Sequence, residues 1–196
     1  MSEIENELPE ESAPEPSQGE SSRGGLSLAL LQLVRIPTVF TAVGDIFLGF
    51  LLTHDSLEPT ATFALLLGTS VCLYWTGMIL NDYFDRDVDA DERPGRPIPS
   101  GRVSAGTALK IALLLNATGL GLAYLAGQNS LIVAGALTVA VWLYDGALKK
   151  TPLAPLLMGS CRFGNVMLGA SAVPAGELWI PPQLVIAIGL GLYIVG

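Results

Sequence analysis

The residues best suited to chemistry lie in one short acidic stretch, between Asn81 and Asp91. It holds five aspartates and one asparagine in eleven residues, directly after a long apolar run. On a helix, Asn81, Asp85 and Asp89 drift by about 40° and rise by about 6 Å per step, so they share one face, and Asp82 joins it. Clustered oxygen ligands favour a hard cation such as Mg²⁺, which commonly bridges carboxylates to the phosphates of a substrate.

Three other interpretations of this stretch compete with a magnesium site. It can be a solvated helix end, although stacked carboxylates repel one another and so many of them require a counter-charge. The alternating aspartates also match an EF-hand loop, but Ala90 stands where its turn needs glycine and Arg96 where a bidentate glutamate belongs. Membrane enzymes that transfer a phosphoalcohol use clustered aspartates too, but the Asp-Gly and Ala-Arg pairs of that pattern do not precede these aspartates.

The next segment, residues 92–102, places positive charge beside the acids. Its prolines exclude a helix and stiffen the chain. Arg93, Arg96 and Arg102 can reach back over the acidic face, and acids for a metal next to arginines for an anion suit a diphosphate. The alternative is that these arginines only set the orientation of the chain in a membrane.

Membrane-spanning helices are the elements expected to position these groups. Of the 196 residues, 51% are hydrophobic and 14% are charged, and the mean hydropathy is +0.52. Soluble domains carry about 25% charged residues. One histidine and two cysteines exclude a His/Cys zinc site, and no basic patch large enough for nucleic acid is present in the sequence. The composition therefore predicts an all-α, polytopic transmembrane bundle.

Six apolar runs are candidate spans, because a spanning helix needs roughly 20 apolar residues. Residues 26–35 can instead lie along the membrane surface, with Pro37 in the first turn of the first span. Residues 1–25 hold seven Glu and one Arg, a charge of −6, and are expected to form a disordered acidic tail. The six runs are residues 31–52, 61–80, 107–126, 131–148, 153–173 and a last run from about 183 to 196.

Basic residues are confined to alternate connections between these runs. The second connection carries four arginines, with Lys110 just inside the third run, and the fourth carries Lys149 and Lys150, whereas residues 54–60, 127–130 and 174–182 carry none. By the positive-inside rule, the basic connections and the N-terminus lie in the cytoplasm, which predicts a multi-pass protein of the cell inner membrane. The last run is too short to span, so residues 26–196 are expected to be a transmembrane domain truncated at its C-terminal end.

The acidic stretch and the loop after it resemble the UbiA superfamily of intramembrane prenyltransferases. The matching pattern is Asn81-Asp82-x-x-Asp85-x-x-x-Asp89, followed by Arg-Pro-x-Arg-Pro-Ile-Pro-Ser-Gly. The resemblance covers roughly residue 31 to the end. It implies about nine helices, of which about six are present here, and a second Asp-rich motif that these 196 residues do not contain. It also implies that Asn81, Asp85 and Asp89 bind Mg²⁺ and an isoprenyl diphosphate.

Further candidates for diphosphate binding follow from the later helices. Tyr144 and Lys149 resemble a Tyr and a Lys after the fourth helix of this family, where the spacing is usually four residues and here is five. Arg162 and Asn165 lie three residues apart inside the fifth run, so they share one face of a helix. Placing an arginine inside a membrane span costs free energy, so such a residue is expected to be functional or paired with an acid. Arg162 can meet the diphosphate or pair with Asp45. The residues around it also resemble the EboC-like subgroup of UbiA-like proteins.

Together these residues predict a Mg²⁺-dependent prenyltransferase acting within the lipid bilayer. Asp85 and Asp89 are the expected catalytic residues, with Asn81 as third metal ligand; Mg²⁺ would neutralise charge on the leaving diphosphate. The acceptor is an unidentified aromatic or lipid molecule. The alternative is a non-catalytic UbiA-like protein that binds or transports an isoprenoid or lipid. The expected diphosphate-binding side chains are Asn81, Asp82, Arg93, Arg96, Tyr144, Lys149, Arg162 and Asn165.

Overall fold

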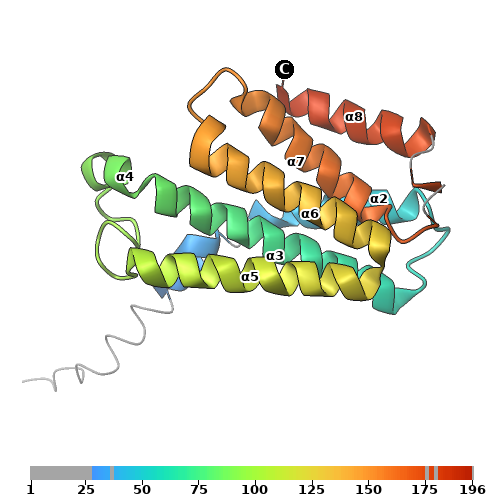
Figure 1. Cartoon of the computed structure of the whole chain (residues 1–196), viewed down its shortest axis with the longest axis horizontal. Helices are drawn as coiled ribbons and strands as arrows, with labels where there is room; N and C mark the ends of the chain where they lie inside the picture. Colours follow the sequence, from blue (N-terminus) through green and yellow to red (C-terminus); the bar gives the residue numbers. More distant parts are fainter. Residues whose placement is uncertain (1–27, 36–37, 175–176, 179–180, 196) are drawn as a thin grey trace, which may run out of the picture.

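The computed structural model of the chain describes residues 28–35, 38–174, 177–178 and 181–195 (Figure 1). The regular elements within these residues are helical, which confirms the all-α class. The tail predicted over residues 1–25 lies outside the described residues. After a short helix, Leu28–Val34, the elements are α2 (Val39–Leu51), α3 (Thr60–Phe84), α4 (Arg86–Glu92), α5 (Ala105–Ala126), α6 (Gln128–Leu143), the π-helical turn η2 (Tyr144–Leu148), α7 (Ala154–Gly169) and α8 (Pro181–Val195).

Each predicted apolar run contains a helix, and the first run contains two. Leu28–Val34 and α2 meet at 47°, with Arg35 between them. Arg35 has a φ of 46°, a left-handed conformation that is uncommon outside glycine and turns the chain sharply. The second run continues into the acidic stretch as predicted, so the last turn of α3 carries Asn81 and Asp82.

Three helical stretches within the described residues are long and apolar enough to cross a membrane. They are α3, α5 and the continuous stretch Gln128–Leu148, with a fourth if the bent pair at Arg35 is one span. Helices α7 and α8 are shorter, with 16 and 15 residues. The topology of six crossings therefore stays a prediction.

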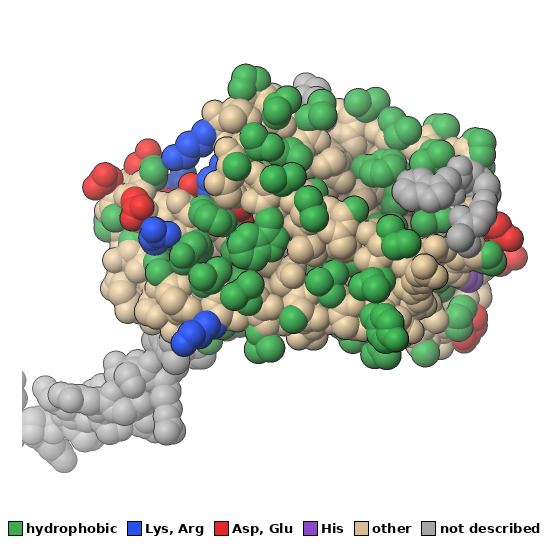
Figure 2. All heavy atoms as spheres, in the orientation of Figure 1, with side chains coloured by type: hydrophobic (Ala, Val, Ile, Leu, Met, Phe, Trp, Pro, Cys, Tyr) green, Lys and Arg blue, Asp and Glu red, His purple; other side chains and the backbone are tan. Residues whose placement is uncertain are grey.

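The outer surface is apolar over the middle of the molecule and charged toward its ends. Leu114, Tyr124, Leu125 and Ile132 are each more than half exposed. Figure 2 shows hydrophobic side chains spread over the helix faces, with Lys and Arg toward the end where α4 lies and Asp and Glu at both ends. Apolar surface of this extent fits a lipid environment, and the charged ends fit membrane–water boundaries.

Helix α7 packs against α2, α6 and α8, and its contact with α2 is unusually close. A Cβ atom at Gly49 would lie 2.0 Å from the carbonyl oxygen of Val166, and one at Gly169 would lie 2.6 Å from that of Ile46. Glycines that allow such an approach are typical of helix pairs in membranes. This crossing brings the polar residues of α2 and α7 together.

The arginine-bearing loop between α4 and α5 is anchored to the bundle, not free. Ile98 and Val103 are buried in a cluster with Leu33 and Leu80. Backbone N–H groups of Ser100 and Val103 donate to carbonyls within the same loop at 3.0 Å. The loop therefore holds Arg96 at a defined place beside the acidic stretch, as its prolines predicted.

Candidate active site

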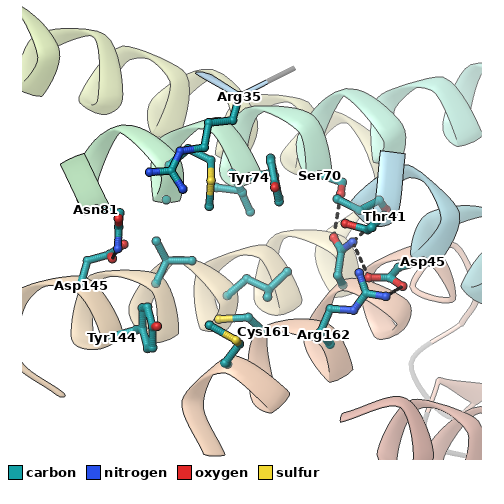
Figure 3. A pocket seen from close by; sticks show the side chains of 18 residues that line it. Arg35, Thr41, Asp45, Ser70, Tyr74, Asn81, Tyr144, Asp145, Cys161 and Arg162 are labelled. Carbon is teal, nitrogen blue, oxygen red and sulfur yellow. Dashed lines mark hydrogen bonds and ion pairs between the residues drawn. The ribbon is translucent and has the colours of Figure 1, made fainter. Parts of the chain in front are cut away.

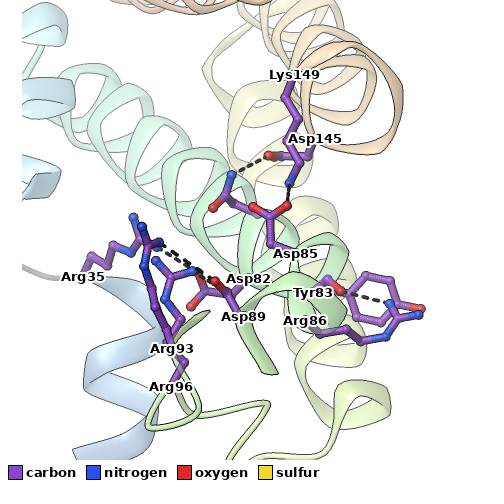
Figure 4. Close-up of polar contacts among 11 residues, drawn as sticks. Arg35, Asp82, Tyr83, Asp85, Arg86, Asp89, Arg93, Arg96, Asp145 and Lys149 are labelled. Carbon is purple, nitrogen blue, oxygen red and sulfur yellow. Dashed lines mark hydrogen bonds and ion pairs between the residues drawn. The ribbon is translucent and has the colours of Figure 1, made fainter. Parts of the chain in front are cut away.

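The acidic motif lies at the junction of α3 and α4, where the helix breaks for one residue. Asp85 stands at the break, with φ −90° and ψ 0°. Its N–H still donates to the carbonyl of Asn81 at 3.0 Å, and the N–H of Asp89 donates to the carbonyl of Asp85 at 2.8 Å. The backbone spacing is nearly helical, but the side chains do not share the single face that the sequence predicted. Figure 4 shows them divided between two groups of partners.

Asp82 and Asp89 face the arginines. Arg35 donates a hydrogen bond to Asp82 at 2.8 Å. Arg96 donates to Asp82 at 3.2 Å and also forms a close ion pair with Asp89. Both carboxylates are almost fully buried, with side chains 5% and 3% exposed. Arg93 is more distant, 3.9 Å from Asp89, and 59% exposed. Asp82 and Asp89 thus share Arg96 as a partner.

Asp85 faces the other way, toward the end of α6. The Nζ atom of Lys149 lies 2.7 Å from its carboxylate, and Asn81 donates to Asp145 at 3.2 Å. The backbone N–H of Lys149 donates to the carbonyl of Tyr144 at 2.9 Å, which closes the π-helical turn. A π turn spans five residues, so it accommodates the five-residue spacing that would put Lys149 out of phase on an α-helix.

These groups form a charge-balanced cluster, here called the rim. Four carboxylates are matched by four cations, so no net charge is left over among them. Asp82, Asp85 and Asp89 each pair with a cation, which offsets part of the cost of burying them, and Asp145 accepts a hydrogen bond from the amide of Asn81. The rim consists of Arg35, Asn81, Asp82, Asp85, Asp89, Arg93, Arg96, Asp145 and Lys149.

A cavity of about 490 Å³ runs from the rim into the bundle. Arg35, Asn81 and Asp145 line one end, and Tyr144 lies beside them. The middle is lined by apolar side chains such as Leu73 and Val141, and by Gly77. Its volume is in the range usual for small-molecule sites, and the combination of apolar walls and few polar groups is typical of them.

The far end of the cavity is lined by a polar network, here called the floor: Asp45, Ser70, Arg162 and Asn165. Arg162 lies 3.0 Å from one oxygen of Asp45, and Asn165 donates to the other at 3.2 Å. Asn165 also donates to the carbonyl of Ala42 at 2.9 Å and accepts from Ser70 at 2.7 Å. Figure 3 shows Asn81 and Asp145 at one end of the cavity and this network at the other.

The structure therefore separates the predicted diphosphate-binding residues into two sets. Six of them lie at the rim or, like Tyr144, beside it. Arg162 and Asn165 lie at the floor and contact Asp45, which is the pairing that the sequence left open for Arg162. Sequence reasoning missed Asp145 and the role of Arg35. Both are ionisable residues inside or next to an apolar run, a signal that marks functional positions in membranes.

The chemistry of the rim is compatible with a magnesium–diphosphate complex. Asn81, Asp85, Asp89 and Asp145 offer the hard oxygen ligands that Mg²⁺ takes, although among the described residues no three His, Cys, Asp or Glu side chains gather closely enough to hold a metal ion by themselves. Each carboxylate is paired with a cation or an amide, so a metal could bind there only if these partners were released. A diphosphate bound with the metal would offer the released cations new partners.

Comparison with known proteins agrees with these observations. The sequence model of the UbiA prenyltransferase family matches residues 39–196 of this chain. The chain is similar to digeranylgeranylglyceryl phosphate synthases. The enzyme of Methanopyrus kandleri is 37% identical over 78% of this chain and 56% of its own length. The enzyme of Methanospirillum hungatei is 40% identical over 50% of this chain and 35% of its own length.

A solved structure of a digeranylgeranylglyceryl phosphate synthase shares the fold. It superposes with a TM-score of 0.75 at 23% identity, covering 87% of this chain and 58% of the other. The chain spans about half the length of the relatives it matches. The EboC-like subgroup is not confirmed by these comparisons. The match over residues 39–196, together with the motif at the end of α3 and the helical fold, places this multi-pass membrane protein in the UbiA prenyltransferase family.

Proposed function

We propose that this chain forms the donor-binding half of a membrane prenyltransferase. The observation that carries the proposal is the rim: paired acids and cations at the mouth of an apolar cavity. An isoprenyl diphosphate has the complementary form, a highly charged head on an apolar tail. The head would bind at the rim, and the tail would lie along the apolar walls away from water.

The rim cations bind the leaving group in this proposal. Arg96 and Lys149, with help from Arg35 and the more exposed Arg93, exchange their carboxylate partners for phosphate oxygens. Asn81, Asp85 and Asp89 would hold Mg²⁺, which when bound supplies positive charge to the diphosphate as it leaves. Asp82 contacts both Arg35 and Arg96, and we assign it to positioning these two arginines.

The reaction exchanges one carbon–oxygen bond for another and transfers one proton. The bond between C1 of the prenyl group and the diphosphate oxygen breaks, and the electron pair leaves with the diphosphate. An acceptor oxygen then bonds to C1 and gives up its proton. Asp145 is the carboxylate that lines the cavity at its mouth, so we assign it as the base that takes this proton.

The acceptor proposed is a glyceryl phosphate lipid that offers a hydroxyl group. This proposal rests on the relatives named digeranylgeranylglyceryl phosphate synthase, whose product name describes prenyl groups on a glyceryl phosphate. The four cations of the rim support it, because a phosphate-bearing acceptor and a diphosphate donor both need cations at the same end of the cavity.

Orientation in the membrane is part of the proposal. The rim end carries most of the basic side chains, so it would face the cytoplasm by the positive-inside rule, with the N-terminus on the same side and the cell inner membrane as location. Labelling of single cysteines introduced at Arg102 and at Asp55, with an impermeant reagent on intact cells, tests it. Labelling at Asp55 alone agrees, and labelling at Arg102 alone contradicts it.

Substitution of Asp85 tests the catalytic role directly. In the full-length protein, Asp85→Asn is expected to lower turnover at least a hundredfold, because it removes one charged ligand from the diphosphate site. Release of diphosphate from a labelled isoprenyl diphosphate with Mg²⁺ and acceptor is the measurement. Asp87→Asn is the matched control, since the Asp87 side chain is 85% exposed and pairs with Arg86.

Three outcomes separate the candidate functions. Loss of turnover in Asp85→Asn but not in Asp87→Asn supports the proposal. Equal turnover in both variants contradicts the role of Asp85. Binding of the isoprenyl diphosphate by the unaltered protein without diphosphate release supports the non-catalytic alternative.

A further inference from the structure

We propose that Lys149 competes with the metal ion for Asp85, so that metal and diphosphate bind to the rim together. The proposal rests on the proposed function, since it takes Asp85 as a metal ligand and Lys149 as a contact of the diphosphate. The ammonium group of Lys149 opposes binding of a metal ion alone. A diphosphate draws this group away from Asp85 and so raises the affinity for the metal.

Asp85 differs from the neighbouring acids of its motif in the number of cations that hold it. Its carboxylate lies 2.7 Å from the Nζ atom of Lys149, and within the described residues no second Lys or Arg forms an ion pair with it. Asp82 and Asp89 each lie within ion-pair distance of two arginines. A metal ion that binds to Asp85 therefore has to displace a single cation, and that cation is Lys149.

The ammonium group of Lys149 has donors to spare for a second acceptor. Its side chain is 12% exposed, and apart from the ion pair its buried Nζ atom has no hydrogen-bond partner among the residues that the structure describes. An ammonium group carries several N–H donors, and a buried donor without a partner costs free energy. Phosphate oxygens would satisfy these donors, so a diphosphate at the rim offers Lys149 partners that Asp85 alone does not provide.

The backbone of Lys149 is anchored, so the exchange of partners needs only its side chain to turn. Its N–H donates to the carbonyl of Tyr144 at 2.9 Å within the π turn. The charge lies at the end of a flexible stem, which can swing without moving this backbone. Arg96 is held differently, because it contacts two carboxylates at once. Lys149 is therefore the rim cation best placed to respond to a diphosphate.

The signs of the charges explain why each ligand needs the other. A metal ion that approaches Asp85 alone meets the positive charge of Lys149, and a diphosphate that arrives alone meets the negative charge of Asp85. Figure 4 shows Asp85, Asp145 and Lys149 in one group, apart from the arginines. If the diphosphate raises the affinity for the metal, the metal raises the affinity for the diphosphate by the same factor. The two are then also expected to leave the rim together.

Binding of Mn²⁺, used in place of Mg²⁺, tests the competition without any turnover. The electron paramagnetic resonance signal of free Mn²⁺ reports how much of the ion is bound by the full-length protein in the absence of diphosphate. Lys149→Met removes the charge but keeps a side chain of similar length, and it is expected to raise the affinity for Mn²⁺ at least about tenfold, a usual size of coupling between two sites. Lys149→Arg keeps the charge and should leave the affinity low.

Two controls separate this competition from a general effect of charge. Lys150→Met removes the charge of the exposed neighbouring residue and should leave the affinity for Mn²⁺ unchanged. An equal gain in Lys149→Met and Lys150→Met, or no gain in Lys149→Met, overturns the proposal. The gain should also disappear when Asp85→Asn is added to Lys149→Met. If it persists, the ion binds away from Asp85 and the proposal is wrong.

The unaltered protein provides a second measurement that does not depend on the folding of a variant. Its affinity for Mn²⁺, expressed against the free ion, is expected to rise at least about tenfold when inorganic diphosphate is added. The rise should be smaller in Lys149→Met, and association of Mn²⁺ with diphosphate in solution cancels from this comparison. Equal affinity with and without diphosphate overturns the proposal while the proposed function stands. If labelled inorganic diphosphate does not bind even with Mn²⁺, the proposed function itself is contradicted.

Discussion

The rim and the floor are two polar clusters in one cavity, and they differ in where their cationic residues lie relative to the helices. At the rim, Arg35 lies at a helix junction, Arg93 and Arg96 follow the end of α4, and Lys149 follows the π turn. At the floor, the cation is Arg162, in the middle of α7. Cations at the ends of elements can exchange partners without disturbing a helix. A cation inside a helix, paired with a buried acid, holds its place.

Solvent exposure does not follow the same division. Asp82 and Asp89 at the rim are 5% and 3% exposed, and Asp45 at the floor is 4% exposed. Among the cations, Arg162 at the floor is 26% exposed, which lies between Lys149 at 12% and Arg93 at 59%. Both clusters therefore hold buried carboxylates that are costly to leave without a counter-charge. The place of the cations along the chain, and not their exposure, distinguishes the rim from the floor.

Loss of the floor cation should produce the largest effect on stability. Arg162→Ala leaves Asp45 buried without its counter-charge, and the free energy of unfolding is expected to fall by about 3 kcal/mol or more. Unfolding in mixed detergent micelles measures this. Adding Asp45→Ala should recover most of the loss. If the double variant is as unstable as the single one, Arg162 stabilises through packing and not through charge.

The crossing of α2 and α7 is expected to be the next most sensitive feature. Gly49→Ala introduces a Cβ atom at 2.0 Å from the carbonyl of Val166, so the helices must separate. A loss of about 1–3 kcal/mol is expected. Gly44→Ala on the same helix is the control, because a Cβ there meets nothing within 4 Å and alanine favours the helix. Equal effects at both glycines would show that the close approach does not hold the floor together.

At the rim, the effect should appear in ligand binding more than in stability. Lys149→Met removes one cation from the proposed diphosphate site, and the affinity for inorganic diphosphate with Mg²⁺ is expected to fall about tenfold, as for one charged hydrogen bond. Titration calorimetry measures it. Lys150→Met, at the exposed neighbouring position, should leave the affinity unchanged. Equal losses in both variants would indicate general attraction by positive charge and no defined contact.

Arg93 should give the smallest effect. It is the most exposed of the rim cations and lies 3.9 Å from Asp89. Arg93→Ala is expected to change the free energy of unfolding by about 0.5 kcal/mol or less, as for other exposed ion pairs. A loss comparable to that of Arg162→Ala would remove the contrast between rim and floor.

The sequence by itself determined the helices and the position of the acidic motif. Apolar runs long enough for helices and the charged connections between them can be read locally, because both depend on neighbouring residues. The four-residue spacing placed Asn81, Asp85 and Asp89 near a helix end, and the prolines predicted the rigid loop after it. The family pattern then pointed to a diphosphate.

The tertiary structure decided which charges meet. Arg35 pairs with Asp82, and Asp45 with Arg162, across long stretches of chain that no local periodicity connects. The break at Asp85 turns its carboxylate toward Lys149, while Asp89 faces Arg96. Such pairings depend on which helix faces pack together, and at the floor this depends on two glycines that let α2 and α7 approach closely. Spacing along one helix shows which side chains share a face, but only the packing of helices shows what that face contacts.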